Sequence, residues 1–87
     1  MEIDEFLSSK VRIRILKLLS ELGELNIRRI CQKTRSNYAV VKGHLTVMEK
    51  MDLVQCKKYG RISLYRLNEN NPKVKILKRL FEIWQTK

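Results

Sequence analysis

The sequence predicts a mostly α-helical domain with one small β-hairpin, its elements following one another as three helices, two strands and a last helix. Two observations carry this prediction. Apolar residues recur at intervals of three and four in four separate stretches, which is the spacing of one face of an α-helix. After the third stretch, two short apolar runs flank Lys57-Lys58-Tyr59-Gly60-Arg61, a pattern typical of a β-hairpin.

The first helix is predicted to follow Ser8 or Ser9, either of which can cap it, and to stop at Gly23. Its main apolar face comprises Val11, Ile15, Leu18, Leu19 and Leu22. A second apolar strip on another side of the same helix comprises Phe6, Ile13 and Leu16. This strip needs its own cover, which we expect from the last helix or from a partner subunit.

Two further helices are predicted on either side of a tight polar turn. Asn26 can cap the first, which ends near Lys33 and whose buried positions are Ile27, Ile30 and Cys31. The polar run Thr34-Arg35-Ser36-Asn37 supplies the turn, and Ser36 or Asn37 can cap the second, which runs to about Met51. Such a pair forms a helix-turn-helix, here at about residues 26–51.

The second helix of this pair is predicted to have an outward face that does not serve the core. Its inward residues are Val41, Leu45 and Met48, and its outward residues are Ala39, Lys42, Gly43 and Thr46. A small, polar face of this kind can enter the major groove of DNA, which admits a helix only when bulky side chains do not hold it off.

The hairpin, at about residues 53–67, is predicted to have a basic tip. Gly60 can adopt the positive φ that tight hairpin turns require, and three cations lie within five residues. A basic hairpin that follows a helix-turn-helix is a wing, so the predicted architecture is a winged helix-turn-helix. The wing cations Lys57, Lys58 and Arg61 are candidates for phosphate or minor-groove contact, because a hairpin tip contributes little to a core.

The last helix is predicted at about residues 72–86, with Asn71 as its cap and Pro72 in its first turn. One apolar stripe comprises Val74, Leu77, Phe81 and Trp84, and a second beside it comprises Ile76, Leu80 and Ile83. Two stripes are more apolar surface than one side of a small domain can bury. We therefore expect an interface on this helix.

Charge and size indicate the partners. The chain has 87 residues, with 19 Lys and Arg against nine Asp and Glu, for a net charge of +10. This balance favours a polyanion such as nucleic acid, although excess lysine can also serve solubility alone. A single domain this small gains stability from pairing with a second copy. The acidic start and the lack of a long apolar run predict a cytoplasmic, nucleoid-associated protein rather than a secreted or membrane protein.

Several functional classes find no support in the sequence. His44 is the only histidine and the two cysteines are far apart, which are too few ligands for a closed metal site. The chain has no nucleophile, base and acid set and no glycine-rich phosphate loop, so we expect neither an enzyme nor a cofactor. No small-molecule ligand is evident. Cys31 and Cys56 are interpreted as buried thiols, with a redox role for Cys56 beside its lysines as the alternative.

In this order of elements the chain resembles the ArsR-like winged helix-turn-helix regulators, especially small archaeal ones. The resemblance covers nearly the whole chain and rests on Ser9-Lys10-Val11-Arg12-Ile13-Arg14-Ile15-Leu16, Leu25-Asn26-Ile27-Arg28-Arg29-Ile30, Val41-Lys42-Gly43-His44-Leu45, Leu53-Val54, Gly60-Arg61-Ile62 and Leu64-Tyr65-Arg66-Leu67.

The resemblance implies that Tyr38, Ala39, Lys42 and Gly43 approach bases, that the wing straddles a neighbouring backbone, and that the terminal helices form a dimer. Two positions depart from the family. Asp52 stands where Gly is usual, and Gly43 stands where a longer polar side chain is common. Asp tolerates the left-handed conformation, so the turn is expected to survive. Direct base reading at Gly43 is expected to be poor.

The hypothesis is a homodimeric regulator that binds double-stranded DNA sequence-specifically, with repression as the simplest output. Predicted DNA contacts are Arg35, Ser36, Asn37, Tyr38, Ala39, Lys42, Gly43, Thr46, Lys57, Lys58, Tyr59 and Arg61, and the predicted dimer interface is Phe6, Ile13, Leu77, Leu80, Phe81 and Trp84. Tyr38 has packing against the preceding helix as its alternative, and Arg28, Arg29 and Lys33 are further candidate phosphate clamps. The competing hypotheses are a non-specific architectural protein and a protein-interaction module that uses the last helix.

Overall fold

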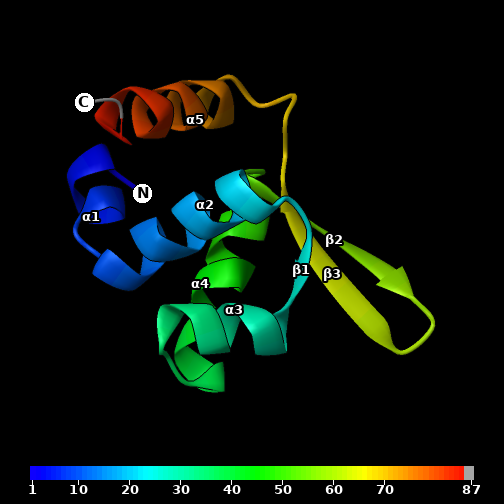
Figure 1. Cartoon of the computed structure of the whole chain (residues 1–87). Coiled ribbons are helices and arrows are strands. Elements are labelled where there is room, and N and C mark those ends of the chain that lie inside the picture. Colours follow the sequence, from blue (N-terminus) through cyan, green and yellow to red (C-terminus); the bar gives the residue numbers. More distant parts are fainter. Residues whose placement is uncertain (86–87) are drawn as a thin grey trace.

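The computed structural model describes residues 1–85 and confirms the predicted fold class, a mostly helical domain with a small hairpin. The elements are α1 (Ile3–Leu7), α2 (Lys10–Leu22), β1 (Leu25–Asn26), α3 (Ile27–Thr34), α4 (Tyr38–Lys50), β2 (Val54–Tyr59), β3 (Ile62–Leu67) and α5 (Pro72–Gln85). In Figure 1 the β2–β3 hairpin extends away from the helices, and α1 and the end of α5 lie far from its tip. The predicted end of the last helix at residue 86 lies outside the described residues.

The predicted helix starts are confirmed by side-chain caps. Ser9 accepts a hydrogen bond from the Arg12 amide, and Asn26 accepts one from the Arg29 amide. Asn37 and Asn71 cap α4 and α5 in the same manner. Each cap satisfies an amide that the first helical turn leaves without a partner, which fixes where the helix begins.

The chain before Ser9 differs from the prediction. Phe6 does not lie on the first long helix but on the separate short helix α1, because the backbone breaks at Ser8 and Ser9. Phe6 and Leu16 are both buried within the chain, so this part of the strip is covered by the chain itself and not by a partner subunit. Leu22, predicted on the buried face of the same helix, is 49% exposed.

Arg12 fastens α1 to α2. Its Nη1 donates to the backbone carbonyls of Glu5, at 3.2 Å, and Phe6, at 3.0 Å, and its guanidinium lies 5.4 Å from the centre of the Phe6 ring. These carbonyls belong to the last turn of α1, where a cation is favoured by the helix dipole. The buried side chain of Arg12 therefore caps the C-terminal end of α1, a helix of five residues.

The segment predicted as a simple bridge, Glu24-Leu25-Asn26, contains a strand. Leu25 and Asn26 form β1, which pairs antiparallel with β3 opposite Tyr65 and Leu64. The sheet therefore has three strands in the order β1-β3-β2, with β3 in the centre. The wing is joined by hydrogen bonds to the residue that caps α3.

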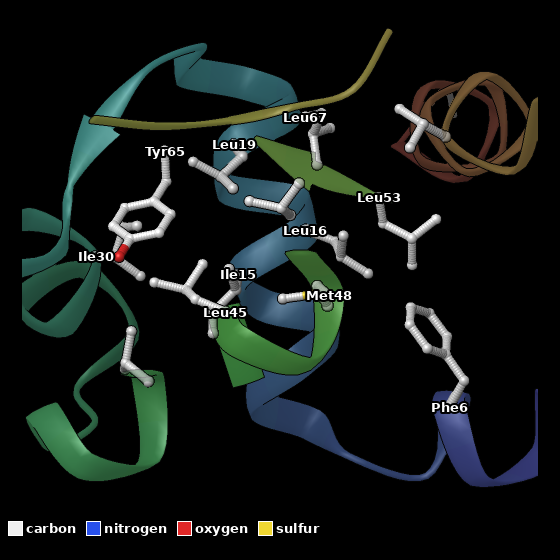
Figure 2. Close-up of a cluster of buried hydrophobic side chains, with 13 residues drawn as sticks. Phe6, Ile15, Leu16, Leu19, Ile30, Leu45, Met48, Leu53, Tyr65 and Leu67 are labelled. Atoms are coloured by element: carbon white, nitrogen blue, oxygen red, sulfur yellow. The ribbon is translucent and has the colours of Figure 1, made fainter. Parts of the chain in front are cut away.

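The core lies between α2, α4, β3 and the start of α5 (Figure 2). Phe6 lies at one edge of the cluster and Tyr65 at the other. On α5, Val74 is buried and Leu77 and Phe81 are half-buried, whereas Trp84 is 82% exposed and does not continue their stripe inward as predicted. No helix within residues 1–85 has both the length and the apolar composition needed to cross a membrane.

Candidate nucleic-acid interface

The turn between α3 and α4 sets the exposed start of α4. Arg35 ends α3 in the left-handed conformation, with φ of 54°, and its amide donates back to Cys31 and Gln32 carbonyls. The Asn37 side chain then accepts a 2.9 Å hydrogen bond from the Val40 amide. Because hydrogen bonds close both ends of the turn, the direction of α4 relative to α3 is set there.

The outward face of α4 is open to solvent. Its exposed residues are Tyr38, Ala39, Val40, Lys42 and Gly43, and Thr46 is half-buried. Tyr38 is 60% exposed, which favours its groove-facing alternative over packing against α3. A Cβ added at Gly43 would have no neighbour within 4 Å, so none of the described residues stands in front of the helix at this position.

Val40 is an exposed residue that the sequence analysis omitted from the site. It is 41% exposed, although the sequence gives it the appearance of a core residue beside Val41. Successive residues in a helix project about 100° apart, so Val40 cannot share the direction of the fully buried Val41. Applied to the Val40-Val41 pair, this rule could have identified Val40 as an exposed residue of the site from the sequence.

Lys42, predicted to approach the bases, is hydrogen-bonded to Tyr65. Its Nζ donates to the Tyr65 hydroxyl at 3.0 Å and lies 5.7 Å from the centre of the Tyr65 ring. Donating this hydrogen bond to the Tyr65 hydroxyl raises the pKa of Lys42, so the amine stays protonated. Burial raises the pKa of Tyr65, which keeps its hydroxyl neutral. The contact ties α4 to the central strand of the wing.

The wing has the basic tip that the sequence predicts. Strands β2 and β3 pair from Val54 opposite Leu67 to Tyr59 opposite Ile62, and Gly60 has φ of 62° in the turn. The exposed residues at and beside this turn are Lys57, Lys58, Tyr59, Gly60 and Arg61.

Other cations lie on α3 and at its end. Arg28, Arg29, Lys33 and Arg35 are exposed. Within residues 1–85 the ion pairs join Lys78 to Glu69 and Arg79 to Glu82, so none of the cations of α3 or the wing is in an ion pair. Unpaired cations on a surface are free to neutralise phosphates, and each such contact releases a condensed counterion.

The remaining chemistry-bearing side chains do not assemble a site. Among the described residues no three His, Cys, Asp or Glu side chains gather in a way that could hold a metal ion. Cys31 and Cys56 are free and half-buried. Nε2 of His44 lies 3.4 Å from the Ser9 hydroxyl, and burial, with a smaller contribution from Arg12, lowers the pKa of His44.

A separate apolar groove lies between α1 and α5. It is lined by Met1, Ile3, Phe6, Leu7, Met51, Leu53, Lys73, Ile76, Leu77 and Leu80. Of the predicted interface residues, Leu77 and Leu80 line this groove, Trp84 is exposed further along α5, and Ile13 and Phe81 are half-buried. Phe6 lines the groove but is only 7% exposed, which leaves little of its ring for a partner.

The comparisons with known proteins agree with this geometry. The family model described as bacterial regulatory protein, arsR family, matches residues 9–55. The arsenical resistance operon repressor of Escherichia coli K12 is 29% identical over 72 residues, which are 83% of this chain and 62% of that protein. The chain thus spans less than two thirds of that relative. An HTH-type transcriptional regulator of Methanocaldococcus jannaschii is 27% identical over 82 residues, which are 94% of this chain and 91% of that protein.

A solved structure shares the fold. The homodimeric winged helix-turn-helix DNA-binding domain of a Mycobacterium bovis protein, described as a possible ArsR-family transcriptional regulator, superposes with a TM-score of 0.71. It is 26% identical, and the match covers 94% of this chain and 70% of that one. The winged helix-turn-helix is therefore common to both.

Proposed function

The chain belongs to the ArsR family of bacterial regulatory proteins, and we propose that it regulates transcription by binding double-stranded DNA sequence-specifically as a homodimer. The family consists of regulators rather than enzymes, and this chain is not an enzyme. Repression by occupying a promoter is the simplest output for a domain of this size, and the E. coli relative is a repressor.

The observation that carries the proposal is the unpaired positive charge on both sides of the exposed face of α4. An α-helix fits the major groove, where base edges are accessible, and the outward face of α4 is free to enter it. Cations at the end of α3 and on the wing then meet the flanking phosphates. The proposed contacts are Arg35, Ser36, Asn37, Tyr38, Ala39, Lys42, Gly43, Thr46, Lys57, Lys58, Tyr59 and Arg61.

The proposed dimer uses the groove between α1 and α5. Ile76, Leu80, Ile83 and Trp84 are exposed along α5, a continuous apolar surface that a second copy would bury. The helices that border the groove, α1 and α5, lie far from the wing tip (Figure 1), so a pair joined there would keep both wings free. A two-fold dimer presents two α4 helices to successive major grooves about 34 Å apart, and so reads a roughly palindromic site.

A non-specific architectural role is the second candidate. It is favoured by Ala39 and Gly43, because short side chains on the outward face of α4 supply no hydrogen bonds to base edges. Such a protein would coat DNA through its cations alone, in association with the nucleoid.

The deciding experiment is a DNA-binding titration at several salt concentrations. It compares a duplex enriched from random sequence with a scrambled duplex of the same length. We expect a preference of roughly 10³ or more for the enriched duplex and a steep fall of log affinity with log salt. The triple variant Lys57→Ala, Lys58→Ala, Arg61→Ala should reduce the salt slope by up to about 0.9 for each lost phosphate contact.

Equal affinity for the two duplexes would favour the architectural role. If neither duplex bound at low salt, both DNA hypotheses would fail and the protein-interaction module on α5 would be left. In that case the triple wing variant should keep full function.

A further inference from the structure

Three polar side chains at the cap and along the outward face of α4 form hydrogen bonds within the chain. Oδ1 of Asn37 accepts from the Val40 amide at 2.9 Å, and Nζ of Lys42 donates to the Tyr65 hydroxyl at 3.0 Å. The Thr46 hydroxyl donates to the Lys42 backbone carbonyl at 2.8 Å. These three groups have partners within the chain before DNA arrives, whereas Tyr38 is 60% exposed and takes part in none of these hydrogen bonds.

Apart from Tyr38, the remaining unengaged groups on this face are apolar. Val40 is 41% exposed, and Ala39 and Gly43 are exposed beside it. In a helix, residues three and four apart are neighbours, so Gly43 lies next to both Val40 and Ala39. The open space in front of Gly43 lets another molecule come close to the helix backbone there.

The major groove offers one apolar group to such a face. Guanine is read by paired donors from Arg or Lys, and adenine by the amide of Asn or Gln. Thymine alone displays a methyl group at C5, which is contacted by apolar side chains. Cations surround the face, so the occupant carries negative charge as well as an apolar group, and DNA rich in thymine satisfies both conditions.

We propose that α4 selects its DNA through thymine C5-methyl groups, which pack against Val40 and Ala39. The inference rests on the proposed function and names what that site reads. In this assignment Lys42 is a positioning residue: its hydrogen bond to Tyr65 holds α4 against β3, and the amine does not read a base.

The test replaces thymine with deoxyuridine, one position at a time, in the duplex enriched from random sequence. This change removes the methyl group and leaves the Watson–Crick edge and the phosphates intact. At each contacted position we expect affinity to fall about fourfold. This factor corresponds to the free energy of burying one methyl-sized group. Positions outside the α4 contact should show no change.

Three variants test which residues cause the loss of affinity on deoxyuridine substitution. In Val40→Ala the penalty for deoxyuridine should shrink towards one, because the side chain that packs on the methyl group is gone. In Lys42→Ala the affinity for both duplexes should fall, because α4 loses its hydrogen bond to β3, and the penalty for deoxyuridine should persist at its wild-type size. Lys33→Ala is the matched control: it removes an exposed cation of α3, and should weaken binding to thymine and deoxyuridine duplexes equally. All three positions are exposed, and circular dichroism verifies that the helices are intact.

The failures are distinguishable. Selective binding that is unaffected by deoxyuridine at every position would overturn the methyl-reading inference and leave the proposed function standing. Loss of selectivity in Lys42→Ala, with guanine required at the centre of each half-site, would overturn it in favour of Lys42 as base reader. Equal binding of enriched and scrambled duplexes would overturn the proposed function, and this inference with it.

Discussion

Asn68 donates a 3.0 Å hydrogen bond from its side-chain amide to the backbone carbonyl of Asp52. Asp52 is the residue that turns the chain from α4 into the wing, with φ of 62°, in the left-handed conformation that glycine adopts most readily. Asn71 donates to the same carbonyl at 2.8 Å. Asn68 and Asn71, which follow the wing, thus both stabilise Asp52, which precedes it. Their hydrogen bonds allow the turn to form without glycine.

Replacing Asn68 with alanine should therefore destabilise the fold. Asn68 is 5% exposed, and alanine would lose two hydrogen bonds of its side chain, one to the Asp52 carbonyl and one from the Asn70 amide. A hydrogen bond contributes about 0.5–1.5 kcal/mol, so we expect the free energy of unfolding in urea to fall by about 1–3 kcal/mol. Asn70→Ala is the matched control, since the Asn70 side chain is exposed. Equal stability of the two variants would contradict the assigned role of Asn68.

Arg12→Met should release α1 without unfolding the rest of the chain. The variant loses the hydrogen bonds to Glu5 and Phe6 carbonyls, and bonds from a charged donor contribute about 1.5–3 kcal/mol each. Global stability should change less, because Nε of Arg12 is buried without a partner and methionine removes the cost of burying that charge. Hydrogen exchange at the Phe6 amide should accelerate relative to the Leu16 amide. Arg14→Met, at an exposed position of α2, should leave both rates unchanged.

His44 should make the fold less stable in mild acid. Burial and the nearby Arg12 lower its pKa in the folded state below the ordinary 6.5. Above pH 6.5 both states hold a neutral imidazole and the full contribution to stability is present. As pH falls below that value the unfolded state takes up the proton first, so stability declines until the folded pKa is passed.

The His44 prediction is checked by NMR titration of the imidazole and by urea unfolding at about pH 7.5 and about pH 5. The variant His44→Gln should lose less stability between these two conditions than the wild type, since it lacks this titration. An imidazole pKa at or above 6.5 in the folded protein would refute the prediction.

Trp84→Asp should separate the proposed dimer into folded monomers. Trp84 is largely exposed in the single chain, so a charge there disturbs only a contact with another copy. Loss of a central aromatic from an interface costs about 2 kcal/mol or more, equivalent to a rise of about thirtyfold in the dimer dissociation constant. Sedimentation equilibrium measures this constant. Lys75→Asp, exposed on another side of α5, provides the control, and a dimer that survives Trp84→Asp would place the interface elsewhere.

The features that the sequence predicted correctly depend on near neighbours in the chain. Ser9, Asn26, Asn37 and Asn71 cap amides two or three residues ahead, so their types and positions alone locate the helix starts. The outward positions of α4 follow from its buried residues by helical period. These local patterns were sufficient to predict the fold class and the exposed residues of the wing.

The features it missed depend on contacts distant in sequence or on a choice between two similar faces. The two residues of β1 are too few to show a period, and only their pairing with β3 makes them a strand. The contact between Lys42 and Tyr65 joins a helix to a strand, which no local pattern encodes. Both sides of α5 are apolar, so periodicity could not decide that Trp84 faces outward.

The pairing of β1 with β3 has a consequence for synthesis of the protein. Leu25 is made early, but its partner Tyr65 is made late, after the whole of the helix-turn-helix and the first wing strand. Joining them closes a long loop, whose entropy cost is recovered only when the sheet forms. Translation adds about 5–20 residues per second, so several seconds pass between synthesis of Leu25 and synthesis of its partner strand β3. The three-stranded sheet should thus form in one late step, and a nascent chain that ends at the wing tip should lack it.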